Sequence, residues 1–233
     1  MPLDSRIKVV RGTAIPKPQP NQDTDDIIPS DYLNSITFKE MGKGIYGLER
    51  LSSDGIPKSD HPFNNPSYQG AKVALVGQNY GCGSSRQHAV FAVHGWGIRA
   101  VLAPSYAEIF EGNAPPVGLV AAYVTQENLG LLVNAVVEDP KTEFEVDLDR
   151  KEVRYKGKSV PIDMPEGTRQ AFLTGSWDSL PPLMKDEDGI RSLEQRLPYL
   201  SFGTVSENIR PLQETPTQDI VGETIKRPKE KVD

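Results

Sequence analysis

Short apolar runs alternate with polar turns along the first two thirds of the chain. Three of these runs, at 71–77, 97–103 and 118–124, consist mainly of Ala, Val, Leu and Gly. Runs of this length are typical of buried strands, and residues 85–94 place Ala89, Val90 and Val93 on one helical face. A strand, a helix and a second strand within about 30 residues predict a right-handed βαβ unit with parallel strands.

The remaining pattern extends this unit into a mixed α/β domain. An opening strand is predicted over 6–15, and a helix over 125–137 with leucines and valines recurring on one side. Ser105 followed by Glu108 predicts a capping box at the start of a short helix. Apolar residues alternate on both sides of a turn at 149–151, which predicts a β-hairpin.

A long segment, 32–68, is weakly patterned and rich in Gly, Ser, Pro and Asn. Lys39, Lys43 and Arg50 are scattered through it. A stretch of this length without secondary structure is uncommon inside a compact domain unless it is functional. We therefore expect a loop that faces a substrate or a partner protein.

The last part of the chain predicts helical pieces and then a disordered tail. Breaks are expected at Gly175, Pro181-Pro182 and Gly189 within 165–200. The final piece would carry its apolar residues on one face: Ile190, Leu193 and Leu197. Prolines and mixed charges dominate afterwards, so the pattern predicts one domain over 1–203 and a disordered tail over 204–233.

Composition narrows the possible functions. A formal net charge of −6 gives no general attraction to nucleic acid or to anionic membranes, so an anionic ligand needs a local basic site. The single cysteine, Cys82, excludes an internal disulfide and cannot by itself hold a zinc ion or an iron–sulfur cluster. The N-terminus lacks a signal-peptide pattern and no apolar run reaches membrane-spanning length, so we expect a soluble, cytoplasmic protein.

The candidate chemistry is concentrated in Asn79-Tyr-Gly-Cys-Gly-Ser-Ser-Arg-Gln-His88, between the predicted strand and helix. Gly81 and Gly83 allow positive φ or a close approach of a ligand to the backbone. The helix that follows directs free N–H groups and its positive dipole end towards this turn. The turn therefore suits an anion.

Side chains of the same turn strengthen this expectation. Arg86 offers a planar fork of donors to a carboxylate or phosphate, and Ser84 and Ser85 add hydroxyl groups. A serine held as its alkoxide by backbone N–H groups and a cation could remove a proton α to a carboxylate that Arg86 anchors.

Other interpretations of the motif fit less well. The third glycine of a dinucleotide fingerprint would fall at Arg86, and the Gly-Lys-Ser/Thr of a P-loop is absent. A Cys82–His88 pair would place its base well inside the helix with no orienting partner in sequence, so His88 is favoured as a packed helix residue. The Gly-x-Ser-x-Gly pattern of serine hydrolases is missing.

A second polar loop precedes the long segment. Asp23-Thr-Asp-Asp26 is followed directly by Ile27 and Ile28. Two interpretations stay open: an Asx-type turn that caps the next element, or one or two carboxylates that belong to an active site.

Together these stretches resemble the small subunits of 3-isopropylmalate dehydratases, the aconitase-like isomerases of leucine biosynthesis, and more broadly the swivelling C-terminal domain of aconitases. The resemblance spans roughly residues 6 to 200 and rests on five stretches: 23–29, 68–71, 79–89, 103–110 and Gly118-Leu119. Within them, the Gly-Ser-Ser-Arg-x-His-Ala core at 83–89 is the most specific.

The resemblance implies a swivelling β/β/α domain that closes over a separate large subunit, as a heterodimer or heterotetramer. That subunit would carry a [4Fe–4S] cluster, and this chain would bind no metal itself. By position, Ser84 resembles the catalytic base and Asp25 the carboxylate that orients the site. Arg86, Ser85 and Gly83 would bind the substrate.

The implied reaction is the dehydration and rehydration of a 2-hydroxy di- or tricarboxylate. Isopropylmalate is the first choice, with homoaconitate, citramalate and dimethylmalate left open. The resemblance also implies that the loop with Lys39 and Arg50 reads the γ-substituent of the substrate. Gln87 stands where related proteins commonly carry Glu, and 114–117 lacks the basic residues of many relatives, so a non-catalytic swivel-domain partner is the alternative.

Overall fold

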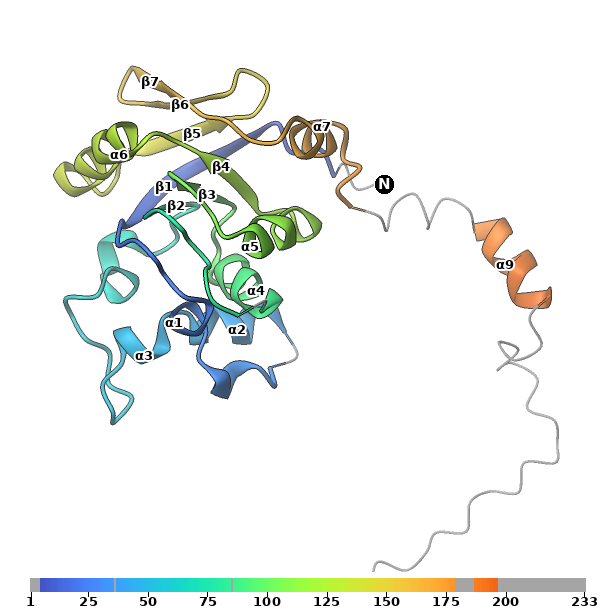
Figure 1. The fold of residues 1–233 in the computed structure, drawn as a ribbon, viewed down its shortest axis with the longest axis horizontal. Coiled ribbons are helices and arrows are strands. Elements are labelled where there is room, and N and C mark those ends of the chain that lie inside the picture. Colours follow the sequence, from blue (N-terminus) through green and yellow to red (C-terminus); the bar gives the residue numbers. More distant parts are fainter. Residues whose placement is uncertain (1–4, 36, 85, 179–186, 197–233) are drawn as a thin grey trace, which may run out of the picture. The chain divides into compact units, whose positions relative to one another are not determined.

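The computed structural model describes residues 5–35, 37–84, 86–178 and 187–196. The chain divides into two units, residues 1–183 and 184–233, and the first contains the sheet (Figure 1). No helix among the described residues is long and apolar enough to cross a membrane.

A seven-stranded sheet forms the centre of the first unit, in the order β4-β3-β2-β1-β5-β6-β7. β1, β2, β3 and β4 are parallel neighbours, so the predicted βαβ unit is confirmed. β5, β6 and β7 continue antiparallel from β1, and β7 is a strand that the sequence did not predict. The strands cover Val9–Lys17, Val73–Val76, Ala100–Ala103, Val120–Tyr123, Glu143–Asp147, Glu152–Tyr155 and Lys158–Pro161.

Both faces of β2, β3 and β4 are buried, which explains their uninterrupted apolar runs. Val73 and Leu75 of β2 point into one core with helix α6, Gln126–Glu138. Ala74 and Val76 point into a second core with helix α4, Gln87–Trp96. Helices therefore cover the sheet on both sides (Figure 1).

The segment 32–68 is not the structureless loop that the sequence predicted. It contains α2, Phe38–Gly44, and α3, Gly47–Arg50, together with single 3₁₀ turns at 62–64 and 66–68, and a further 3₁₀ turn at 30–32 leads into it. These helices are too short to show an apolar period and depend on tertiary contact. A Cβ atom on Gly42 would lie 2.3 Å from the carbonyl carbon of Gly95, so only glycine lets α2 approach α4 this closely.

Two predicted helix starts are wrong. α4 begins at Gln87, two residues later than expected, so His88 lies in its first turn and not well inside it. The short helix α5 covers Glu108–Asn113, and its N-cap residue Ala107 makes no side-chain cap. The predicted capping box of Ser105 and Glu108 does not form, because the Ser105 hydroxyl accepts a hydrogen bond from the Asn79 amide at 2.8 Å.

Of the helical predictions for the C-terminal part, one is confirmed, one is wrong, and the others lie outside the described residues. α7, Glu166–Thr174, ends at Gly175 with φ 83°, as predicted. α9, Glu187–Arg196, runs through Gly189, where a break was expected; a helical glycine costs only about 1 kcal/mol, which does not stop a helix. Ile190 and Leu193 of α9 are half exposed. The prolines at 181–182, Leu197 and the predicted tail 204–233 lie outside the described residues.

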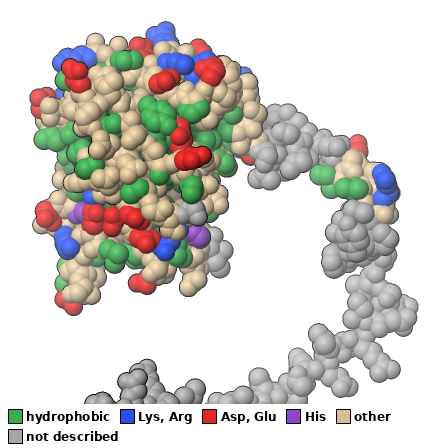
Figure 2. Space-filling view, in the orientation of Figure 1, with side chains coloured by type: hydrophobic (Ala, Val, Ile, Leu, Met, Phe, Trp, Pro, Cys, Tyr) green, Lys and Arg blue, Asp and Glu red, His purple; other side chains and the backbone are tan. Residues whose placement is uncertain are grey.

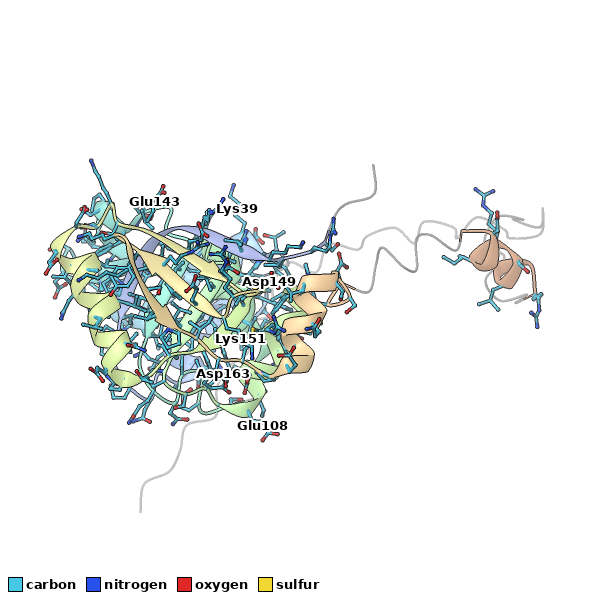
Figure 3. All side chains as sticks on the ribbon, turned by 90° about the horizontal axis from the view of Figure 1, so that it is seen from above. Lys39, Glu108, Glu143, Asp149, Lys151 and Asp163 are labelled. Atoms are coloured by element: carbon cyan, nitrogen blue, oxygen red, sulfur yellow. The ribbon has the colours of Figure 1, made fainter. Side chains whose placement is uncertain are left out.

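The hairpin predicted around 149–151 is confirmed by the pairing of β5 with β6. Its turn is tied to the chain that follows β7. The Lys151 ammonium lies 3.6 Å from an Asp163 carboxylate oxygen, and Figure 3 labels both residues. The same ammonium lies 3.4 Å from a Glu166 carboxylate oxygen. These ion pairs are largely exposed, so each stabilises the hairpin by less than about 1 kcal/mol.

Candidate active site

Two loops meet at the carboxyl end of the parallel strands. One follows β1 and leads into α1, Thr24–Ile27, and the other follows β2 and leads into α4. Because β1 and β2 are adjacent and parallel, both loops leave the same edge of the sheet. Three backbone hydrogen bonds join them, each of 2.9 Å: Asn21 N to Gln78 O, Gly81 N to Gln22 O, and Thr24 N to Cys82 O.

A pair of asparagines makes the matching bends in these loops. Asn21 and Asn79 both have φ 56°, in the left-handed region that asparagine tolerates better than most residues. The Asn79 side-chain amide donates to the Asn21 side-chain oxygen at 2.9 Å. Sequence reasoning did not single out either residue for this role, although two asparagines beside candidate loops were a usable signal.

Asp23 fixes the start of α1. Its carboxylate accepts a hydrogen bond from the Asp25 amide at 2.8 Å, and the Asp26 carboxylate accepts one from the Asp23 amide at 3.2 Å. This is a capping box, so the capping interpretation of the acidic loop is confirmed for Asp23 and Asp26. The Asp25 side chain takes no part in the cap.

Gly83 lies directly against this cap. Its φ is +88°, and a Cβ atom there would lie 2.1 Å from the Asp23 carboxylate oxygen Oδ2. Glycine is needed at this position for two reasons: the backbone has a positive φ, and the two loops approach each other too closely for a Cβ atom. This contact places Gly83 in the wall of the candidate site.

The structure brings Asp25 and Arg86 together as an ion pair. The Arg86 side chain is 27% exposed and that of Asp25 is 55% exposed, so the pair is open to solvent. Ser84, on the loop after β2, is exposed, and its carbonyl accepts a hydrogen bond from the Thr24 hydroxyl of the other loop at 3.0 Å. Ser85, the other predicted substrate-binding serine, lies outside the described residues. On the face shown in Figure 2, acidic side chains gather where Figure 1 places α1.

A third segment, 104–107, supports the site loop from its other side. The Tyr80 amide donates to the Ser105 carbonyl at 3.1 Å, and the Ala107 amide donates to the Tyr80 carbonyl at 2.9 Å. The Tyr80 hydroxyl lies 2.8 Å from that of Tyr46, and both tyrosines are buried. Burial raises the pKa of both phenols, so both stay protonated. Sequence reasoning missed this pair, because nothing in the sequence relates two distant tyrosines.

Cys82 and His88 do not form a nucleophilic pair of the usual kind. Burial and the Asp23 carboxylate raise the pKa of the Cys82 thiol, whereas a nucleophilic cysteine needs a lowered pKa. The His88 ring packs edge-on to Phe91, with 6.1 Å between ring centroids. His88 is thus a packed helix residue, as expected.

The ligands of an iron–sulfur cluster are not present together on this chain. The sequence holds one cysteine, and the described residues contain no group of three His, Cys, Asp or Glu side chains that could hold a metal ion. Cluster chemistry at this site therefore does not fit these residues alone.

Residues 5–127 match the aconitase C-terminal domain family. This chain belongs to that family. The match contains both joined loops and the whole βαβ unit. The predicted α/β swivel-domain fold is thereby confirmed.

Named relatives extend the match along most of the chain. A 3-isopropylmalate dehydratase small subunit from Thermus thermophilus is 38% identical over 194 residues, which cover 83% of this chain and 96% of that protein. The corresponding small subunit of Synechocystis is 35% identical over 200 residues, covering 86% and 98%. The crystal structure of a 3-isopropylmalate dehydratase from Methanocaldococcus jannaschii superposes with a TM-score of 0.57 at 29% identity, covering 80% and 99%. In length and fold the chain is an aconitase-family small subunit.

Proposed function

We propose that this protein is the catalytic small subunit of a hydro-lyase that isomerises a 2-hydroxy dicarboxylate by dehydration and rehydration. The reaction we favour is 2-isopropylmalate to 3-isopropylmalate, in keeping with the names of the relatives. One observation carries the proposal. Ser84, Asp25 and Arg86 come from two loops that are hydrogen-bonded to each other at the carboxyl edge of the sheet.

Arg86 is the carboxylate anchor in this proposal. Its guanidinium already lies against a carboxylate, that of Asp25, and the pair is exposed enough for a substrate carboxylate to approach. A guanidinium can donate to two carboxylate oxygens at once, which fixes the substrate in one orientation. Asp25 then holds Arg86 in position before the substrate arrives.

Ser84 is the proposed base. It removes the proton from the carbon next to the hydroxyl-bearing carbon, and the electron pair of that C–H bond forms the double bond as the hydroxyl leaves. Rehydration reverses these steps with the hydroxyl added to the other carbon. The positive end of α4 and the Arg86 guanidinium lower the free energy of the serine alkoxide.

The large subunit supplies what this chain lacks. We assign the [4Fe–4S] cluster to that partner, since Cys82 is the single cysteine here. Bound there, a cluster would act as the Lewis acid that takes the leaving hydroxyl. The site described above is thus one half of a site between two proteins.

A non-catalytic role is the second candidate, and two positions favour it. Gln87 is the first residue of α4 and is exposed, so no carboxylate flanks Arg86 on that side. A 3₁₀ turn, Pro115–Val117, stands where basic residues are common in the family. Retention of Ser84, Asp25 and Arg86 in one place argues for catalysis.

The test is a complex reconstituted with its cluster-bearing large subunit and assayed against isopropylmalate, homoaconitate, citramalate and dimethylmalate. We expect turnover of isopropylmalate, seen as formation of the unsaturated intermediate. Ser84→Ala should still assemble but lose nearly all turnover, whereas the control Ser53→Ala, on an exposed turn, should keep it. Turnover of another acid on the panel would replace the substrate, and an active Ser84→Ala variant would remove Ser84 as the base.

A further inference from the structure

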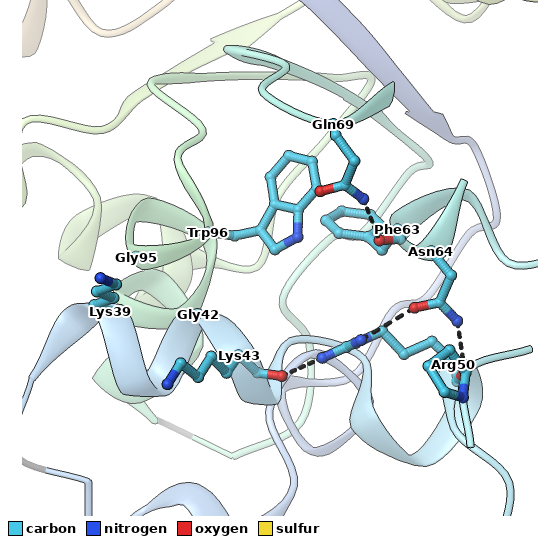
Figure 4. Close-up of a pocket in the computed structure, with 10 residues that line it drawn as sticks. Lys39, Gly42, Lys43, Arg50, Phe63, Asn64, Gln69, Gly95 and Trp96 are labelled. Carbon is cyan, nitrogen blue, oxygen red and sulfur yellow. Dashed lines mark hydrogen bonds between the residues drawn. The ribbon is translucent and has the colours of Figure 1, made fainter. Parts of the chain in front are cut away.

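A pocket of about 450 Å³ lies at the other end of α4 from Ser84 and Arg86. Gly95 and Trp96, the last residues of α4, line it (Figure 4). Since Arg86 directly precedes α4 and Trp96 ends it, the two lie about 15 Å apart along the helix at about 1.5 Å per residue. The pocket is therefore separate from the candidate active site.

The wall of this pocket is basic. Lys39, Lys43 and Arg50 line it, and none of its lining residues in the described chain is acidic. Lys39 and Lys43 are one turn apart on α2, both are exposed, and neither forms an ion pair with a described residue. The nearest carboxylate along α2, that of Glu40, accepts instead from the Thr37 hydroxyl at 3.0 Å. This local positive charge contrasts with the net charge of −6 of the whole chain.

The Arg50 guanidinium keeps N–H donors that no described residue uses. The guanidinium is half-buried, and within the described part of the chain it bonds only to neutral oxygens: the Ile45 carbonyl at 2.6 Å, the Asn64 amide oxygen at 3.0 Å and the Lys43 carbonyl. Three of its five N–H donors are used, and it has no carboxylate partner among the described residues. Burial lowers the pKa of Arg50, as expected for a cation that lacks a counter-charge.

The rest of the wall suits an apolar body. The rings of Trp96 and Phe63 meet edge to face with 4.9 Å between centroids (Figure 4). The Trp96 indole N–H makes no hydrogen bond with a described residue, so it is a further free donor at the pocket. Asn64 and Gln69 add side-chain amides. Aromatic walls with a few converging polar groups are typical of small-molecule sites of this volume.

We infer that this pocket binds a small organic dianion with an apolar body, such as a substituted dicarboxylate. Its two negative groups lie against Lys39, Lys43 and the free donors of Arg50, and its apolar part lies against Trp96 and Phe63. This is a second ligand site, beyond the proposed reaction, and it gives Lys39 and Arg50 a role other than reading the substrate.

The two tryptophans of the chain provide the test. The Trp177 indole N–H donates to the Ser5 carbonyl at 2.6 Å, whereas that of Trp96 has no such partner among the described residues, so the two indole resonances differ in NMR and Trp177→Phe assigns them. The full-length chain is titrated with phenylsuccinate at constant ionic strength. We expect a saturable shift of the Trp96 resonance, with weaker binding of succinate, which lacks the apolar ring.

Variants locate the site. Lys39→Gln with Lys43→Gln should weaken phenylsuccinate binding at least about fivefold, from the loss of two charge interactions. The matched control Lys141→Gln with Lys158→Gln makes the same charge change on exposed residues elsewhere and should not alter binding. Arg86→Gln should also leave it unchanged, which keeps this result independent of the proposed reaction.

Three outcomes would overturn the inference. The first is that phenylsuccinate causes no saturable shift of the Trp96 resonance. The second is that the Lys39→Gln, Lys43→Gln variant binds phenylsuccinate as tightly as the wild type does. The third is that the shift is lost in Arg86→Gln. Suppose that the wild-type chain does not bind phenylsuccinate and that the Lys39→Gln, Lys43→Gln variant fails to assemble with the large subunit. These cations would then be assigned to contact with an acidic surface of that partner.

Discussion

Asp25 and Arg86 form an ion pair although they lie on different loops, one after β1 and one after β2. The pair exists because the two strands are parallel neighbours and because backbone hydrogen bonds hold the loops in register. It makes Arg86 a pre-positioned cation. Its exposure means that the pair adds less than about 1 kcal/mol to stability, so its main effect is on orientation.

Asp25→Asn should separate orientation from stability. We expect the free energy of unfolding to change by less than about 1 kcal/mol, because the pair is exposed. In the reconstituted complex the specificity constant kcat/KM should fall by about tenfold or more, a loss of roughly 1.4 kcal/mol of transition-state stabilisation. Urea unfolding and steady-state kinetics measure the two. Asp31→Asn, an exposed acidic residue of the next turn, is the control, and an equal kinetic effect there would contradict the prediction.

Gly83→Ala tests the close approach of the two loops. The new Cβ would overlap the Asp23 carboxylate and the residue would keep a positive φ, so we expect a loss of at least about 2 kcal/mol in unfolding free energy. Gly55→Ala is the matched control. Gly55 also has positive φ, 76°, but nothing lies within 4 Å of its Cβ position, so only the cost of the backbone conformation, about 1 kcal/mol, applies there. Equal losses in both variants would show that Asp23 moves freely.

Tyr46→Phe and Tyr80→Phe test the buried hydroxyl pair behind the site loop. Each single change leaves the other hydroxyl buried without its partner, which costs about 1–3 kcal/mol. The double variant should cost less than the sum of the two single changes, because no unpaired hydroxyl remains. Chemical denaturation of the four proteins in this cycle measures the coupling, and strictly additive losses would refute it.

We predict that His94, in the last turn of α4, makes the stability of the fold depend on pH. Burial, with a smaller effect of Arg99, lowers its pKa to about 4. Between about pH 6.5, the ordinary value, and the folded value, the unfolded chain binds the proton and the folded chain does not. Stability should therefore fall as the pH drops through this window. Since His94 is partly exposed, we expect a loss of about 1–2 kcal/mol, less than the full shift implies.

The measurement is the free energy of unfolding of the wild type and of His94→Gln across this pH range. Other groups titrate in the same window, so the difference between the two curves is the quantity of interest. The variant should lose less stability on acidification than the wild type. Parallel curves would show that His94 is protonated without cost in the folded chain.

Hydrophobic pattern predicted the parallel part of the fold because β2, β3 and β4 are buried on both faces and therefore read as plain apolar runs. It failed for α2 and α3, since these short helices form through tertiary contacts, α2 against α4 and α3 against α1, and not from their own periodicity. The capping box at Ser105 failed for a related reason. Its hydroxyl was taken by Asn79, a partner that only the folded chain brings near.

The sequence predicted the separate parts of the candidate site, but not that they come together in the folded chain. The glycines and charges of 79–88 indicated an anion turn, and the acidic loop offered two interpretations. In the structure, Asp23 and Asp26 form the cap of α1, whereas the neighbouring Asp25 pairs with Arg86. Alternate roles for adjacent carboxylates depend on helix geometry, which residue order alone does not reveal.

The backbone hydrogen bonds between the loops after β1 and β2 make the site depend on a non-local strand pairing. The bonded residues, 21–24 and 78–82, lie 57 to 59 residues apart in the chain, and the parallel pairing of β1 with β2 is what brings them together. A fragment that contains 79–88 without β1 would therefore have the motif but no site. Binding at this turn is thus a direct report of long-range strand pairing, and it can serve as a probe for the slow, non-local step of folding.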